Sequence, residues 1–197
     1  MMSAPAPSVQ GSQALARKII MPGESFTAWA PTEISTLLGS CVSACLWDSR
    51  LKIGGMNHFM LPEAPGAISG LGDATKSLRY GLYAMECLIN ELMHMGAKRE
   101  TLVAKVFGGA NITGVLNTQH VGRRNAEFVS EFLWKDKIKT AAADLGGLHS
   151  RRVKFNTQTG GVRVERVASA DSIAVKQERK YSESLNQDPV NGDIVFF

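Results

Sequence analysis

One cysteine and one histidine stand out because their spacing lets them face each other across a predicted hairpin. Cys41 opens the apolar run 41–47, and His58 follows it by seventeen residues in a second extended run. If the turn lies between Ser49 and Arg50 and has an even number of residues, Cys41 faces His58 directly, with Cβ atoms about 4.5–5.5 Å apart. A three-residue turn would instead place the two side chains on opposite faces.

A thiol beside an imidazole is the arrangement with which cysteine hydrolases attack a carbonyl carbon. A free thiol is only roughly 3% thiolate at pH 7, and an adjacent imidazole raises that fraction. The imidazolium then protonates the leaving group. Gly39 and Ser40 precede Cys41 and can bring backbone N–H groups close to a substrate, as an oxyanion hole requires. The same pattern also fits a buried cysteine and a core histidine, so the pair alone leaves catalysis open.

The other cysteines and the glycine-rich segment do not form a second site in the sequence. Cys45 lies on the same predicted strand face as Cys41, about 13 Å along it, which is too far for a disulfide or for a zinc site with Cys41 and His58. Cys87 falls inside a predicted helix. Segment 108–114 is glycine-rich but lacks the ending of a phosphate-binding loop, and it is expected to shape the active-site wall. Three histidines have no partner in the sequence and are expected on the surface or in the core: His94, His120 and His149.

The composition indicates a soluble globular protein. The chain has 197 residues, of which 44% are hydrophobic and 20% charged. No stretch approaches the ~18 apolar residues of a membrane span, and the first residues lack the apolar core of a secretory signal, so we expect a cytoplasmic protein without membrane insertion. The net charge of +4 is mild and does not indicate nucleic-acid binding.

Three regions are expected along the chain. Residues 1–18 offer little apolar surface and are predicted to form a flexible arm, followed by a catalytic domain over residues 19–167. Residues 168–197 are predicted to be a loosely held polar tail, although the four residues that close it, Ile194-Val-Phe-Phe197, are apolar.

The periodicity of the domain predicts an α+β fold. The chain is expected to be extended from Ile34 to Pro62, with strands at 41–47 and 52–61. Further strands are expected at 101–107, 137–144, 153–155 and 162–167, and the last two are expected to form a hairpin through Gly160-Gly161. One helix is expected from an N-cap at Asp73 to a stop at Gly96, and a second over 123–135. The inward-facing residues expected on the two helices are Leu78, Leu82, Met85, Ile89, Leu92 and Met93, then Phe128, Phe132 and Leu133.

The motifs around the Cys–His pair resemble those of the CheD family of chemoreceptor glutamine deamidases. The resemblance begins with Leu38-Gly-Ser-Cys-Val42 and with Gly54-Gly-Met-Asn-His-Phe-Met-Leu-Pro62, and spans about residues 20–167. Further matching motifs follow in the family's order: Arg79-Tyr-Gly81, Ala84-Met-Glu86, Leu88-Ile-Asn90, Lys105-Val-Phe-Gly-Gly-Ala110, Arg124-Asn125, Glu127-Phe-Val129, Asp144-Leu-Gly-Gly147, Arg151 to Phe155 and Thr159-Gly160.

The resemblance implies a protein-glutamine glutaminase. Members hydrolyse the side-chain amide of receptor glutamines to glutamate and ammonia, and the same site can cleave glutamyl methyl esters. Carried over, the nucleophile is Cys41 and the base is His58. The family's hydroxyl residue falls on Ser35, with Thr36 beside it, so either hydroxyl can orient the imidazole. No metal or organic cofactor is implied.

The resemblance also implies a fold and partners. The family fold is a layered α/β/β sandwich that resembles the catalytic domain of glutamine-deamidating bacterial toxins. The expected substrates are the cytoplasmic helices of methyl-accepting chemoreceptors. Two other functions remain: a non-catalytic binding module that regulates a CheC-type response-regulator phosphatase, and a cysteine peptidase, for which no substrate-groove signature is recognisable.

Overall fold

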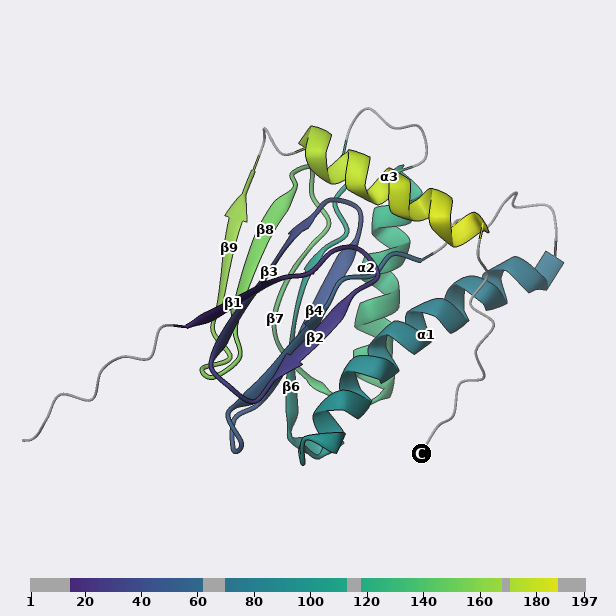
Figure 1. Cartoon of the computed structure of the whole chain (residues 1–197). Coiled ribbons are helices and arrows are strands. Elements are labelled where there is room, and N and C mark those ends of the chain that lie inside the picture. The colour runs from purple at the N-terminus through teal and green to yellow at the C-terminus, as the bar shows by residue number, and fades with distance from the viewer. Residues whose placement is uncertain (1–14, 62–69, 113–117, 168–170, 188–197) are drawn as a thin grey trace, which may run out of the picture.

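The computed structural model describes residues 15–61, 70–112, 118–167 and 171–187. Two β-sheets lie face to face, and two long helices cover the outer face of one of them (Figure 1). A third helix crosses one end of the strands. The α+β class predicted from the sequence is confirmed, and the layers follow the order helices, sheet, sheet. No helix in these ranges is long and apolar enough to span a membrane.

Each sheet is mixed, with one parallel pair. The four-stranded sheet has the order β1 (Ala16–Ile19), β3 (Thr32–Leu38), β8 (Arg151–Asn156) and β9 (Val162–Arg166). The five-stranded sheet has the order β2 (Ser25–Ala28), β5 (Ile53–Asn57), β4 (Val42–Asp48), β6 (Leu102–Gly108) and β7 (Lys139–Leu145). The parallel pairs are β1 with β3 and β6 with β7. Strands β8 and β9 form the hairpin that the sequence predicts.

The helices are α1 (Gly70–His94), α2 (Thr118–Lys135) and α3 (Asp171–Gln187), with a 3₁₀ turn, η1 (Arg99–Thr101), before β6. Helix α1 ends near Gly96, as predicted, because that glycine adopts a φ of 87°. It begins at Gly70, so Asp73 lies inside the helix and the predicted N-cap is wrong. Met93 is 39% exposed and was wrongly assigned to the inner face, whereas the three predicted residues of α2 are buried.

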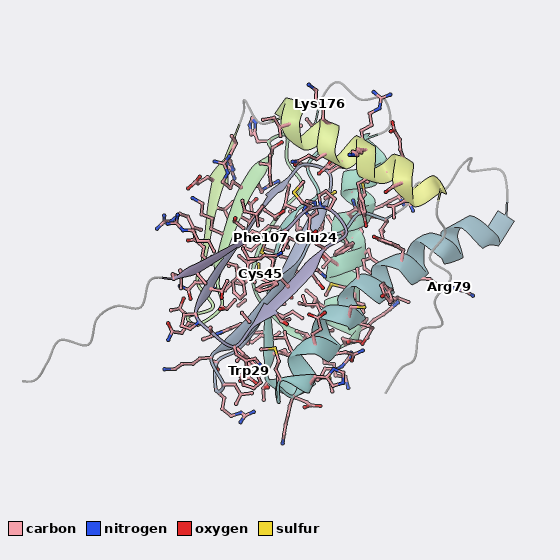
Figure 2. The ribbon with its side chains drawn as sticks, in the orientation of Figure 1. Glu24, Trp29, Cys45, Arg79, Phe107 and Lys176 are labelled. Carbon is pink, nitrogen blue, oxygen red and sulfur yellow. The ribbon has the colours of Figure 1, made fainter. Side chains whose placement is uncertain are left out.

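Strand β4 separates two apolar cores because its side chains alternate between the two faces of its sheet. Val42 and Leu46 pack against α1 and α2. Cys41 and Cys45 face the four-stranded sheet. Figure 2 shows Cys45 in this second core, together with Phe107 of β6. All three cysteines are free, and Cys45 has the core position expected from the sequence.

The hairpin of β4 and β5 corrects the predicted register. Asp48 pairs with Ile53 rather than with Leu51, so the turn contains four residues and the register is displaced by two. A displacement of two keeps each side chain on its predicted face. Cys41 and His58 are therefore not directly opposed but are diagonal neighbours on the same face.

The two ends of the chain depart from the expected regions. Residues 16–18, assigned to a flexible arm, belong to β1, because their backbone pairs with β3. The expected loose tail contains α3, in which Glu178 and Leu185 are buried. Residues 1–14 of the arm and the apolar closing segment 194–197 lie outside the described residues.

Candidate active site

Cys41 and His58 meet where the strands of the hairpin end. Cys41 directly precedes β4, and His58 directly follows β5. The His58 backbone leaves the ladder, since its N–H donates to the Glu24 carbonyl at 2.9 Å and its carbonyl accepts from the Gly23 N–H at 2.7 Å. The thiol, an imidazole nitrogen and a carboxylate oxygen of Glu178 lie within 4.8 Å of one another. The structure thus brings the predicted nucleophile and base together.

Thr36 fixes the orientation and tautomer of the imidazole. Its Oγ1 lies 2.7 Å from His58 Nδ1 and 2.8 Å from the Ile20 carbonyl oxygen. The carbonyl can only accept, so the single hydroxyl hydrogen is donated to Ile20, and Nδ1 must carry the proton that Thr36 accepts. His58 Nε2 is buried and has no hydrogen-bond partner among the described residues. This nitrogen is left with a lone pair for the thiol proton.

Ser35, the residue at the family's hydroxyl position, lies next to Thr36 on β3, and its side chain points away from the imidazole of His58. Successive side chains of a strand point to opposite faces, and along β3 Ser35 is half-buried while Thr36 is buried. Of the two candidate hydroxyls, Thr36 is the one that contacts His58. The hydroxyl that contacts His58 is therefore one residue later in the chain than the position that the resemblance implies.

Three successive backbone N–H groups form a cradle beside the thiol. The N–H groups of Gly39, Ser40 and Cys41 donate to the Glu178 carboxylate at 2.8, 2.9 and 3.0 Å, and the Ser40 hydroxyl adds a fourth bond at 2.7 Å. Successive N–H groups that point to one place bind anions. We refer to the N–H groups of residues 39–41 as the N–H cradle.

The cradle is aligned by bonds on its other side. The carbonyls of residues 39–41 all accept bonds from the segment that leads from β6 into α2 or from α2 itself. The Gly39 and Ser40 carbonyls share their peptide planes with the Ser40 and Cys41 N–H groups, so these bonds fix the direction of two of the three cradle donors. The bonds run from Ala110 N–H to Gly39 at 2.8 Å, from Gly109 N–H to Cys41 at 2.7 Å and from Asn125 Nδ2 to Ser40 at 2.8 Å. The glycine-rich segment therefore shapes the site wall, as expected, as far as the structure describes it.

Gly39 is required by space. A Cβ at this position would lie 3.0 Å from both Glu178 carboxylate oxygens and 2.3 Å from Ile112 Cδ1. Its φ is outside the left-handed region, so the constraint comes from the close approach of the Ile112 side chain and of the carboxylate rather than from backbone strain. The sequence also predicts a close approach at Gly39, but by a substrate.

The pair is electrostatically neutral in this structure. Burial, followed by the negative charge of Glu178 and a hydrogen bond with it, raises the pKa of the Cys41 thiol well above its ordinary value. Burial lowers the pKa of His58 to about 3. The expectation of a thiolate activated by the imidazole therefore does not hold while Glu178 occupies the cradle. Cys41 is also 0% exposed.

Among the residues that the structure describes, Cys41, His58 and Glu178 lie close enough together to hold a metal ion, and thiolate, imidazole and carboxylate form a familiar zinc ligand set. However, the two carboxylate oxygens already accept four hydrogen bonds from residues 39–41. A carboxylate held by N–H groups is a bound anion, and its lone pairs are directed at those donors rather than at a shared cation.

Sequence reasoning missed Glu178, Asn57 and Asn125. Asn57 replaces a ladder bond of β4, because its Oδ1 accepts the Ala44 N–H at 2.9 Å. Asn125 also accepts the Leu61 N–H at 2.8 Å, so it ties the two strand ends together. Both asparagines lie in motifs that carry the resemblance. For Glu178, the available signal was its spacing from Tyr181 and Leu185, which places all three on one helix face.

Comparison with known proteins gives a consistent result. Residues 60–166 match the family model described as CheD chemotactic sensory transduction. The chain is 45% identical over 179 residues to a Thiobacillus denitrificans protein named "Probable chemoreceptor glutamine deamidase CheD", covering 90% of this chain and 88% of the relative.

Two more relatives agree. A Shewanella oneidensis protein, "Probable chemoreceptor glutamine deamidase CheD 1", is 44% identical over 179 residues, with 90% of this chain and 86% of the relative covered. A Janthinobacterium protein with the same name as the first relative is 43% identical over 183 residues, covering 90% and 87%. The chain belongs to the CheD family.

Proposed function

We propose that this chain is a protein-glutamine deamidase that converts glutamine side chains on the cytoplasmic helices of chemoreceptors to glutamate. The observation that carries the proposal is the N–H cradle beside a buried Cys41, whose neighbour His58 has Nε2 free to take the thiol proton. The names of the relatives supply the substrate class. The layered fold is also compatible with the likeness to glutamine-deamidating toxins.

The proposed reaction begins with attack of Cys41 on the amide carbon of the substrate glutamine. His58 takes the thiol proton at Nε2, while Thr36 holds the Nδ1–H. The oxygen of the tetrahedral intermediate becomes negative, and the N–H cradle stabilises that charge. His58 then gives its proton to the departing nitrogen, which leaves as ammonia, and Cys41 remains as a thioester.

Water completes the reaction. His58 removes a proton from water, which attacks the thioester carbon, and the intermediate again places its negative oxygen in the cradle. Collapse releases a glutamate side chain and returns the Cys41 thiol. The net change is amide plus water to carboxylic acid plus ammonia. On a receptor helix this adds a negative charge, which shifts helix packing and the signalling equilibrium.

The test is incubation of the whole chain with a cytoplasmic chemoreceptor fragment. Each conversion adds about one dalton and releases one ammonia, as expected of amide hydrolysis. Mass spectrometry of the receptor peptides locates the modified glutamines. A fragment that stays unchanged with the wild-type chain, and also with α3 released from the site as described below, would refute the proposal.

The second function weighed from the sequence, a module that regulates a CheC-type phosphatase, needs a surface and no nucleophile. The tautomer fixed by Thr36 and the aligned cradle serve acyl transfer and would be unnecessary for binding alone. These features favour the enzyme. We also place the site of action in the cytoplasm, where the proposed substrate helices lie.

A further inference from the structure

Helix α3 inserts a carboxylate into the site that acyl transfer requires. Glu178 is 6% exposed and lies 137–139 residues along the chain from its hydrogen-bond donors. Both of its carboxylate oxygens are used, one by Gly39 and Cys41 and the other by the N–H and hydroxyl of Ser40. All the donors assigned above to the reaction's negative oxygen are therefore taken by one side chain of the same protein.

The chemical identity of this side chain matters. The product of glutamine deamidation is a glutamate side chain, and Glu178 is a glutamate side chain with an oxygen within 4.8 Å of both the Cys41 thiol and a His58 nitrogen. Its carboxylate has the same carbon and oxygen geometry as the product, at the place where the product must form.

The helix is docked by more than its carboxylate. Tyr181 and Leu185 follow Glu178 at the third and seventh positions, which are on the same face of a helix. Leu185 is buried, and Tyr181 packs against the core between the sheets. Gly23 leaves room for the Tyr181 ring, since a Cβ there would approach its Cε2 to 2.7 Å.

The opposite face of α3 is charged and open to water. Lys176, Arg179, Lys180 and Glu183 are exposed. Figure 2 shows Lys176 on the outer side of the helix. Figure 1 shows α3 lying across the ends of the strands, where Cys41 directly precedes β4 and His58 directly follows β5. The helix therefore covers the thiol with one narrow face.

We propose that α3 is an intramolecular product mimic that closes the active site and is displaced by the substrate helix. The proposal rests on the proposed function, because it identifies the site Glu178 occupies as the deamidation site. It also defines the substrate more closely: a helix that presents a glutamine, with apolar or aromatic side chains three and seven residues after it.

Thiol alkylation tests the closure without using the enzymatic activity. Glu178→Ala removes the carboxylate. Tyr181→Ala keeps Glu178 but weakens the docking of α3 on the domain. Both should raise the rate of Cys41 alkylation by iodoacetamide at least about tenfold, because the reagent gains access to a thiol that α3 otherwise buries. Glu183→Ala, an exposed carboxylate on the same helix, is the matched control and should match wild type. Circular dichroism checks that each variant is folded.

Receptor kinetics give a second measurement of displacement. A tethered competitor reduces the fraction of molecules that can bind substrate. Glu178→Ala should therefore lower the KM for a receptor fragment about tenfold and leave kcat unchanged. Glu183→Ala should change neither. A fall in kcat for Glu178→Ala would contradict the proposal, because it would make Glu178 part of the catalytic machinery.

Glu178→Gln tests the product geometry directly, because it converts the mimic into a substrate held in place. Cys41 should attack the amide carbon of Gln at position 178, ammonia should leave, and water should restore glutamate. Peptide mapping should then find glutamate at position 178, about one dalton heavier than the encoded glutamine. The double variant with Cys41→Ala should retain glutamine, as should the neighbouring Gln177 in both chains.

The outcomes separate this proposal from the proposed function. Persistence of glutamine at position 178 in a chain that deamidates the receptor fragment would overturn the product-mimic assignment and leave the function standing. Unchanged alkylation in folded Glu178→Ala and Tyr181→Ala would overturn closure. Faster alkylation without any receptor deamidation would support closure and refute the proposed function.

Discussion

Both ends of β4 carry a carboxylate that accepts backbone N–H groups, and the two differ in where the carboxylate comes from. After the strand, Asp48 Oδ1 accepts the N–H groups of Arg50 and Leu51 at 2.9 and 3.0 Å, within its own turn. Before the strand, Glu178 accepts the N–H groups of residues 39–41 from a helix more than 130 positions away. The hydrogen bonds are of the same kind, but only the first set forms within one hairpin.

Because of this difference, the Asp48 bonds are structural, whereas the Glu178 bonds can be exchanged for bonds to another group. The Asp48 bonds form with the turn itself, and Thr101 adds a bond to Oδ2 at 2.5 Å. The Glu178 bonds require α3 to dock, so they are lost whenever the helix leaves, while the strands remain paired. The end of β4 that carries the chemistry is the one whose anion can be exchanged for a substrate.

The largest expected effect is on enzymatic activity and concerns the end of β4 where Glu178 binds. Cys41→Ala removes the nucleophile and should lower kcat by about 10³-fold or more, the scale seen when one member of such a unit is lost. His58→Ala should do the same, and the double variant should be little worse. Deamidation of a receptor fragment followed by mass spectrometry measures this, with circular dichroism as the folding control. Near-normal turnover by folded His58→Ala would contradict the assigned role.

The second largest expected effect is on the free energy of unfolding, and it concerns Asp48 at the other end of β4. Asp48→Ala leaves the turn N–H groups and Thr101 without their buried acceptor and should lower the free energy of unfolding by about 2 kcal/mol. Glu178→Ala should cost less, because water reaches the cradle once the helix releases it. Urea unfolding measures both. If the two costs are equal, the distinction between structural and exchangeable carboxylates is wrong.

A smaller effect on kcat is expected from Thr36, which contacts the imidazole at the catalytic end of β4. Thr36→Val removes the hydroxyl that orients His58 and should lower kcat about 10- to 100-fold, since orientation supplies only part of the rate. Thr36→Ser keeps the hydroxyl and should restore most of the activity, which a packing role would not predict. Ser35→Ala is the matched control on the same strand and should be near normal.

Acid should destabilise the closed site through His58. Its pKa in the folded chain is lowered to about 3 by burial, against 6.5 for an ordinary histidine. The unfolded chain therefore binds a proton below pH 6.5 that the folded chain does not, and stability falls as the pH decreases from 6.5 toward 3, by at most about 1.4 kcal/mol per unit. Urea midpoints measured between pH 7 and pH 5 should decrease, and His58→Gln should flatten that slope.

The smallest expected effect is that of a chelator. If Glu178 is an anion in the cradle, dialysis against a strong chelator should leave the deamidation rate and the Cys41 alkylation rate unchanged. A loss of activity that zinc restores would make Cys41, His58 and Glu178 metal ligands. The parallel between Asp48 and Glu178 as N–H acceptors would then be broken.

The parts of the fold with a clear side-chain period were predictable. Strand β6, helix α1 and the β8–β9 hairpin follow their patterns closely. Strand β3 does alternate, but the sequence analysis predicted only extended chain from Ile34 and no separate strand. Strands β1 and β2 were missed, because their residues are uniformly exposed or uniformly half-buried and show no alternation. Such edge strands are defined by the partner that binds their backbone, and the partner is not visible in the local sequence.

The site was predictable to the extent that its contacts are local in the hairpin. The register prediction was wrong by two residues, and the Cys41–His58 proximity survived because an even displacement preserves the face. Glu178 could not be placed in the same way. Its contact depends on how α3 docks across the strand ends, which no spacing between positions 41 and 178 encodes.

The bonds that hold the carbonyls beside the N–H cradle determine whether the free energy of aligning the oxyanion hole is spent during folding or during each turnover. The Gly39 and Ser40 carbonyls lie in the same peptide planes as the Ser40 and Cys41 N–H groups. Because Ala110 and Asn125 hold these two carbonyls, aligning the two N–H dipoles is part of folding and is not repeated at each turnover. The Ala110 donor is a backbone group, which any residue but proline supplies. Asn125 contributes through its side chain, so the direction of the Cys41 N–H depends on a single side-chain amide.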